Sequence, residues 1–178
     1  MNVQLDPRDR LLILGESLSG KTYMARRVLA KCRRVVVYTP QADEWTEFPN
    51  RVVGWKPETL YQTIGKCIQT GNVFLAIDDA DLPLDRYASD DRLQYLLVAG
   101  RHRGVGWAVV SRRTADLPPL FFKQANKLFL FQTDLKRDLE IFDEFYACGA
   151  DVKALPRDQY GCLFLDREAR TKTAVVAS

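Results

Sequence analysis

Residues 10–30 read RLLILGESLSGKTYMARRVLA, and they contain the complete pattern G-x-x-x-x-G-K-[ST] from Gly15 to Thr22. An apolar run precedes the pattern and a helical run follows it, which is the context that a phosphate-binding loop requires. The two glycines allow backbone amides to turn toward phosphate oxygens at the start of the helix. Because glycine makes up only about 7% of protein residues, a chance match is rare. The stretch therefore predicts a nucleotide-binding loop.

This loop predicts ATP and Mg²⁺ as the bound groups. Lys21 would reach the β- and γ-phosphates, and the hydroxyl of Thr22 would bind Mg²⁺. The residues expected to contact the nucleotide are Gly15, Glu16, Ser17, Leu18, Ser19, Gly20, Lys21, Thr22 and Tyr23.

A loop of this kind needs a metal-binding acid at the end of another strand. The stretch NVFLAIDDADLPLD (72–85) has this form, with Asp78 and Asp79 directly after the apolar run. Asp78 fits the Walker B role of holding Mg²⁺ directly or through water. Asp79 stands where many ATPases place a glutamate that polarises the attacking water, and it is one methylene shorter. Asp81 and Asp85 are expected to be solvated loop acids.

Short apolar runs alternate with helical patterns along the whole chain. Strands are expected at 10–15, 34–39, 51–55, 73–78, 106–111 and 127–132, and helices at 21–32, 57–69, 90–102, 117–125 and 135–148. Gly71 and Gly149 are expected to end helices, and 160–166 with 171–177 to form a final hairpin. Continuous apolar strands suit a sheet that is covered on both faces. We predict one α/β domain over 1–178, a P-loop NTPase of the ASCE/RecA-like type. Its mainly parallel sheet is flanked by helices and ends in a C-terminal β-hairpin.

Composition limits the other function classes. The net charge is only +3, so any nucleic-acid role must come from clustered charge. The four cysteines are far apart and the chain has one histidine, which argues against a zinc site and favours reduced core thiols. No signal peptide is seen, and no apolar run approaches the roughly 18 residues of a membrane span. We expect a soluble, intracellular protein.

The residues that follow the stretch with Asp78 and Asp79 resemble the FtsK/HerA superfamily of DNA-translocating ATPases. A helix and basic turn, RLQYLLVAGRHRG (92–104), lead into the strand GWAVVS (106–111), and a further apolar strand and a charged helix follow. The strand ends in SRR where the family has Ser/Thr-Gln-Arg. The similarity extends from about residue 10 to residue 166. The short chain is most similar to the genome-packaging ATPases of tailless, membrane-containing viruses.

The resemblance implies roles for three arginines. Arg101 and Arg103 are candidates for an arginine finger that acts on the nucleotide of a neighbouring subunit. A solvated basic helix end is the alternative for each. Arg112 occupies the position of the family's polar sensor glutamine, and a surface ion pair is its alternative.

The function that the resemblance implies is ATP-driven translocation of double-stranded DNA, packaging a viral genome into a preformed capsid. It also implies a ring, with a hexamer expected, and sequence-independent DNA contact. Capsid or membrane vertex proteins are further candidate partners, and the location is the host cytoplasm or the virion. Three alternatives remain open. They are an ATPase of virion assembly and DNA export, a small-substrate P-loop kinase, and a nucleotide-binding scaffold without hydrolysis.

Overall fold

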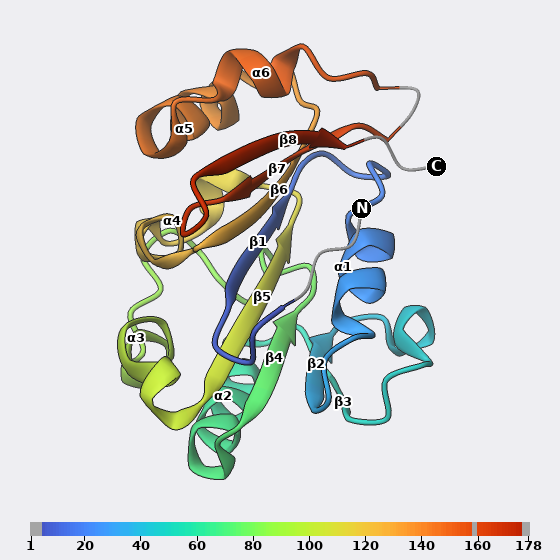
Figure 1. Ribbon diagram of the computed structural model, residues 1–178. Helices are drawn as coiled ribbons and strands as arrows, with labels where there is room; N and C mark the ends of the chain where they lie inside the picture. Colours follow the sequence, from blue (N-terminus) through green and yellow to red (C-terminus); the bar gives the residue numbers. More distant parts are fainter. Residues whose placement is uncertain (1–4, 158–159, 176–178) are drawn as a thin grey trace.

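An eight-stranded sheet forms the centre of the computed structural model, which describes residues 5–157 and 160–175 (Figure 1). The spatial order is β3-β2-β4-β5-β1-β6-β7-β8. Every pairing from β3 to β6 is parallel, and the C-terminal hairpin adds β7 and β8 antiparallel to β6. The strands are β1 Arg10–Leu14, β2 Val35–Thr39, β3 Arg51–Val53, β4 Val73–Ile77, β5 Val105–Ser111, β6 Lys127–Phe131, β7 Cys162–Asp166 and β8 Thr171–Val175. The expected fold class is thereby confirmed, and so is the hairpin as far as residue 175, while residues 176 and 177 of its expected second strand lie outside the described residues.

Helices connect the strands and cover the sheet. The α-helices are α1 Lys21–Leu29, α2 Pro57–Thr70, α3 Asp91–Ala99, α4 Pro119–Gln124, α5 Lys136–Tyr146 and α6 Gly149–Lys153. The 3₁₀ helices are η1 Ala42–Trp45, η2 Gly100–Arg103 and η3 Thr114–Asp116. Strands β4, β5 and β6 are buried along their full length, as continuous apolar runs require when both faces are covered.

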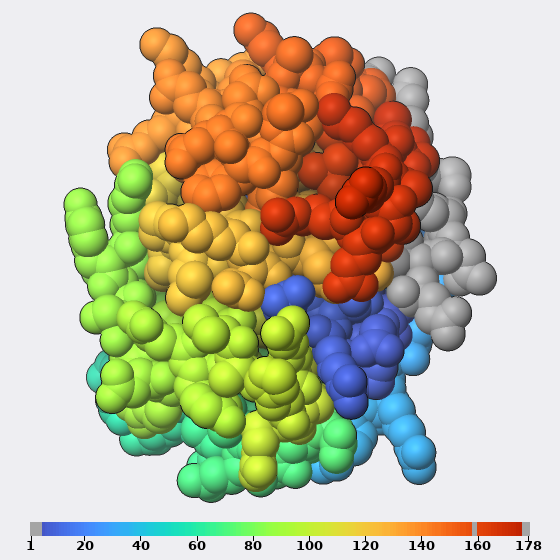
Figure 2. All heavy atoms as spheres, turned by 60° about the vertical axis from the view of Figure 1, so that its left-hand side comes forward, coloured from blue at the N-terminus to red at the C-terminus, as the bar shows by residue number. Residues whose placement is uncertain are grey.

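Two apolar cores lie on the two faces of the sheet. On one face, α1 and Trp45 of η1 pack against residues such as Val37 and Phe129. On the other face, α2 to α6 pack around residues such as Trp107 and Leu128. Figure 2 shows α3, α4 and α5 following one another across this second face. Because helices cover both faces of the sheet, a site can open only at the ends of the strands.

Several helix boundaries differ from those expected; α1, for example, ends at Leu29 and not at residue 32. The expected helix 90–102 is α3 followed by the tighter turn η2, and the side chain of Asp90 caps α3 by accepting from the amide of Arg92. The expected helix 117–125 begins only at Pro119, since residues that precede a proline are disfavoured in helical conformation. Gly149 does not end a helix. Ala147 terminates α5 in a left-handed conformation, and Gly149 begins α6, an element that the sequence did not predict.

All four cysteines are free thiols, and three of them are buried in the cores. Among the described residues, no His, Cys, Asp and Glu cluster could hold a metal ion by itself. None of the helices in this part of the chain combines the length and apolarity needed to cross a membrane.

Candidate functional site

The phosphate-binding loop connects β1 to α1 at the carboxyl edge of the sheet. Gly15 has a φ of +153° and Gly20 a φ of +93°, conformations that side chains disfavour. A Cβ atom on Gly15 would lie 2.6 Å from the Cβ of Phe131, so this position also lacks space for a side chain. Gly20 is the N-cap of α1 and no side chain caps the helix, so the first amides of α1 remain available to an anion. The loop thus has the backbone of an anion cradle.

Lys21 begins α1 and is almost fully buried, with 6% of its surface exposed. Its Nζ donates to the carbonyl oxygen of Glu16 at 2.5 Å, which curls the side chain over the loop. Burial lowers the pKa of the Lys21 ammonium, and the nearby carboxylates of Asp79 and Asp81 oppose that shift. The Lys21 amine thus lies over the loop, where a bound phosphate would contact it.

A cavity of about 680 Å³ opens beside this loop. Six of the residues expected to bind nucleotide line it: Ser17, Leu18, Gly20, Lys21, Thr22 and Tyr23. Its other walls include Gln41, Glu44, Asp79, Arg112, Phe131 and Tyr160. The volume falls in the range of small-molecule sites, and a phosphate cradle, a cation and carboxylates converge on it.

Asp78 lies at the end of β4 and is buried, with 3% of its surface exposed. Its Oδ2 accepts hydrogen bonds from the indole nitrogen of Trp45 at 2.8 Å and from the hydroxyl of Thr39 at 3.1 Å. Burial raises the pKa of Asp78 to about 6, although these two hydrogen bonds favour the charged form. Its Oδ1 has no hydrogen-bond partner among the described residues. One carboxylate oxygen is thus anchored while the other is left for a ligand.

Asp79 and Arg112 form an ion pair on the wall of the cavity. The guanidinium of Arg112 lies 3.5 Å from Asp79 and 3.2 Å from Asp81. Asp79 itself has a φ of +44°, a conformation that non-glycine residues rarely adopt and that recurs at functional sites. Arg112 therefore lines the cavity and also forms the ion pair that was its alternative.

Asp81 is not the solvated loop acid that the sequence indicated. Its side chain is only 2% exposed, and it accepts hydrogen bonds from the hydroxyl of Ser111 and from the amide and guanidinium of Arg112. The prediction was wrong because Ser111 and Arg112 arrive from β5, about thirty residues away in sequence. Asp85 is exposed, as expected, and accepts from the amide of Tyr87.

Three of the nine expected nucleotide-binding residues, Gly15, Glu16 and Ser19, do not line the main cavity. The Glu16 carboxylate accepts from the hydroxyl of Thr133 at 2.9 Å and lies 3.8 Å from the guanidinium of Arg157. Glu16 and Ser19 line a smaller cavity on the other side of the loop. Glu16 therefore holds the phosphate loop against the segment that follows β6, and only its backbone faces Lys21.

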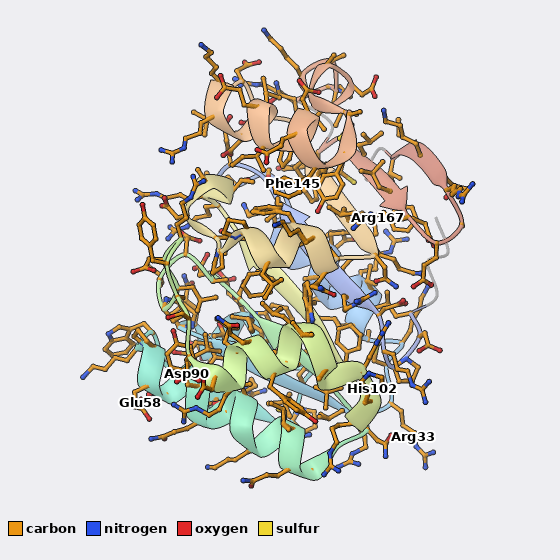
Figure 3. The ribbon with its side chains drawn as sticks, turned by 90° about the vertical axis from the view of Figure 1, so that its left-hand side faces the viewer. Arg33, Glu58, Asp90, His102, Phe145 and Arg167 are labelled. Atoms are coloured by element: carbon orange, nitrogen blue, oxygen red, sulfur yellow. The ribbon has the colours of Figure 1, made fainter. Side chains whose placement is uncertain are left out.

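Arg101 and Arg103 are exposed and lie at the opposite edge of the sheet. Both belong to η2, which directly precedes β5, so they stand at the amino ends of the strands. In Figure 3, His102 of the same turn lies near Arg33, far from Glu58 and Asp90 at the starts of α2 and α3. Arg103 donates to the carbonyl oxygen of Ile68 at 3.4 Å. Neither arginine lines the cavity of its own chain.

Sequence reasoning missed several residues of the site, among them Gln41, Glu44, Trp45 and Tyr160. The first three follow the carboxyl end of β2, an edge where parallel sheets commonly bind ligands. Their position after a predicted parallel strand could therefore have identified them from the sequence. Tyr160 gave no such signal, because its contact with the loop depends on how the hairpin returns to the sheet. A Cβ atom on Gly20 of the loop would lie 3.4 Å from the ring of Tyr160.

No family model matches the chain, and no curated protein sequence matches it. Several solved structures are similar to it. The genome packaging NTPase B204 from Sulfolobus turreted icosahedral virus 2, in complex with sulfate, is 22% identical with a TM-score of 0.82, over 96% of each chain. The conjugation coupling protein TcpA of pCW3 is 14% identical with a TM-score of 0.70, over 99% of this chain and 62% of its own. The N-terminal domain of zonular occludens toxin from Neisseria meningitidis is 12% identical with a TM-score of 0.58, over 96% and 95%. The chain has the P-loop NTPase fold that it shares with B204.

Proposed function

We propose that this protein is an ATPase that translocates double-stranded DNA and packages a viral genome into a preformed capsid. The observation that carries the proposal is the cavity in which the phosphate loop, the Lys21 cation and the Asp79 carboxylate meet. The likeness of the fold to a viral genome packaging NTPase, which was also solved with AMPPCP and with ATP-gammaS, supports it.

The residues fit ATP and Mg²⁺. Asp78 has a buried oxygen without a partner among the described residues, which suits a ligand to the metal or to its water shell. The Thr22 hydroxyl, at the first turn of α1, would complete the protein's contribution. Bound Mg²⁺ would neutralise charge on the β- and γ-phosphates.

The chain's own groups supply the remaining chemistry. The amides of residues 15–23 bind the phosphates, with Lys21 as the cation that contacts the transferred group. Asp79 orients the attacking water from the end of β4. Arg112, which is paired with Asp79 and Asp81 at the wall of the cavity, senses the γ-phosphate in its own subunit.

Arg101 and Arg103 act on a neighbouring subunit. An arginine at the amino edge of the strands is remote from its own cavity, so it can reach a nucleotide only across an interface. Such an interface is head-to-tail, and a head-to-tail interface generates a ring when the rotation closes. A hexamer around duplex DNA, which contacts phosphates without base readout, is the assembly that we propose. Capsid or membrane vertex proteins would dock it to the virion, and it would act in the host cytoplasm.

The test is ATP turnover with and without duplex DNA, on oligomers separated by size. We expect hydrolysis that DNA stimulates in the ring fraction. Lys21→Ala is the control, since it removes the phosphate-contacting charge, and it should abolish turnover while the melting temperature stays close to that of the wild type. Turnover that DNA leaves unchanged would favour a kinase, and nucleotide binding without turnover would favour a scaffold. Either result would overturn the proposal.

A further inference from the structure

Two carboxylates line the cavity among the residues that the structure describes, Asp79 and Glu44. Asp79 follows the end of β4, and Glu44 lies in η1, which follows the end of β2. Strands β2 and β4 are adjacent and parallel, with Tyr38 paired to Ile77 near their carboxyl ends. The two acids therefore reach the same cavity from neighbouring strands.

Glu44 is held in place by the residue next to it. Trp45 is fully buried in the core beneath α1, and its indole is bonded to Asp78, the proposed metal-binding acid. The amide of Glu44 donates to the carbonyl oxygen of Gln41 at 3.3 Å, which closes the turn. The position of Glu44 relative to Asp78 is thus set by the fold and not by a free loop.

The neighbouring acids of the same segment do not share this position. Glu47 pairs with Arg26 on the outside of α1, and Asp43, which is exposed as Glu44 is, does not line the cavity. Glu44 makes no hydrogen bond or ion pair with any residue in the described part of the chain, so its carboxylate is available to a ligand. The negative charge of Glu44 helps to raise the pKa of Asp78.

Asp79 is poorly suited to activate a water molecule without help. Its carboxylate is shared with the guanidinium of Arg112, and its side chain is one methylene shorter than glutamate. A water held by a single, partly engaged acceptor keeps rotational freedom, and orientation of the attacking group accounts for a large part of catalysis.

We propose that Glu44 is a catalytic residue that works with Asp79 on the attacking water, a role that rests on the ATPase function proposed above. Asp79 accepts one hydrogen bond from the water and orients it, while Glu44 accepts the other and takes its proton. The water oxygen bonds to the γ-phosphorus, the bond from that phosphorus to the β–γ bridging oxygen breaks, and ADP leaves with the electron pair. The proton passes from Glu44 to solvent, so the residue is regenerated.

The experiment compares Glu44→Gln, Asp79→Asn and the double variant in ATP turnover, with binding of ATP measured separately. Asp43→Asn is the matched control, since it removes one carboxylate from the same turn outside the cavity. We expect Glu44→Gln to lower kcat by about 10²-fold or more while the Kd for ATP and the melting temperature change little. Asp43→Asn should behave as the wild type. The double variant should be no slower than the slower single variant, because the two groups act on one water.

Three results would overturn the inference. Near-normal turnover by Glu44→Gln would remove Glu44 from the chemistry. Loss of ATP binding in that variant would make it a binding residue. A double variant as slow as the product of the two single effects would make the groups independent. Absence of hydrolysis in the wild-type protein is a separate outcome that would sink the proposed function and this inference with it.

Discussion

The indole nitrogen of Trp45 donates to Oδ2 of Asp78 across 2.8 Å, deep in the protein, and joins the turn after β2 to the end of β4. The bond favours the charged form of a carboxylate whose burial raises its pKa to about 6. It also fixes the direction of Oδ1 of Asp78, which has no partner in the described part of the chain and is the atom proposed to face the metal. One buried tryptophan thus positions both Asp78 and the neighbouring Glu44.

Trp45→Phe should raise the Mg²⁺ concentration needed for half-maximal ATP turnover severalfold. The variant keeps an aromatic ring but removes the donor, so that the pKa of Asp78 rises further and its ionised fraction near pH 7 falls. The lost bond should also cost about 1–3 kcal/mol of unfolding free energy. Magnesium titration of turnover and urea unfolding measure the two effects.

Trp107→Phe is the control for that experiment. Trp107 is as buried as Trp45, but its indole nitrogen has no hydrogen-bond partner among the described residues. The variant should lose stability through packing alone and keep the magnesium dependence of the wild type. An equal magnesium shift in both variants would mean that cavity formation, and not the bond to Asp78, causes it.

Alanine at Arg101 or Arg103 should leave ATP binding nearly intact and lower hydrolysis by roughly 10³-fold or more, if that residue is the finger acting in trans. Mixing the variant with Lys21→Ala subunits should then restore part of the activity, because each subunit supplies what its neighbour lacks. Turnover of the mixed rings, measured against each variant alone, gives the answer.

Arg112→Ala serves as the comparison in cis. Arg112 lines the cavity of its own chain, so Lys21→Ala subunits should not rescue its loss. Full activity in both Arg101→Ala and Arg103→Ala, with or without DNA, would leave η2 as a basic surface turn.

Asp138→Asn should reveal a pH-dependent cost of a buried acid in α5. Burial raises the pKa of Asp138 to about 6 from the ordinary value of 3.8, so the folded state holds this proton more tightly than the unfolded state. The stabilisation of the wild type by that proton is complete below pH 3.8 and is lost as the pH rises through about 6. Relative to the variant, the wild type should gain about 1.4 kcal/mol between pH 7.5 and pH 5.

Urea unfolding of the two proteins at both pH values measures this difference. Asp43→Asn removes the same charge from an exposed position, and its stability should follow that of the wild type at both pH values. A constant difference between the wild type and Asp138→Asn would show that Asp138 does not titrate in this range.

Several features of this protein followed from its sequence alone, because their signals are local. The glycines at 15 and 20 mark backbone conformations and close approaches that side chains do not permit. Continuous apolar runs predict strands buried on both faces, and their alternation with helices predicts parallel pairing. The acid after the β4 run had to lie at the same edge as the phosphate loop, because parallel strands end together. The phosphate loop, the acidic end of β4 and the fold class therefore needed no tertiary information.

Only the tertiary structure decided which polar side chains are buried and paired. Asp78 and Trp45 are 33 positions apart, and Ser111 and Asp81 are 30 apart, so no local pattern relates them. Asp81 lies in a stretch of sequence that is typical of a solvated turn, and its side chain is buried only because the end of β5 covers it. Glu44 and Glu47 look alike in sequence, yet one lines the cavity and the other pairs with Arg26. The position of a charge relative to its ligand depends on how distant elements pack, and packing is set by the whole chain at once.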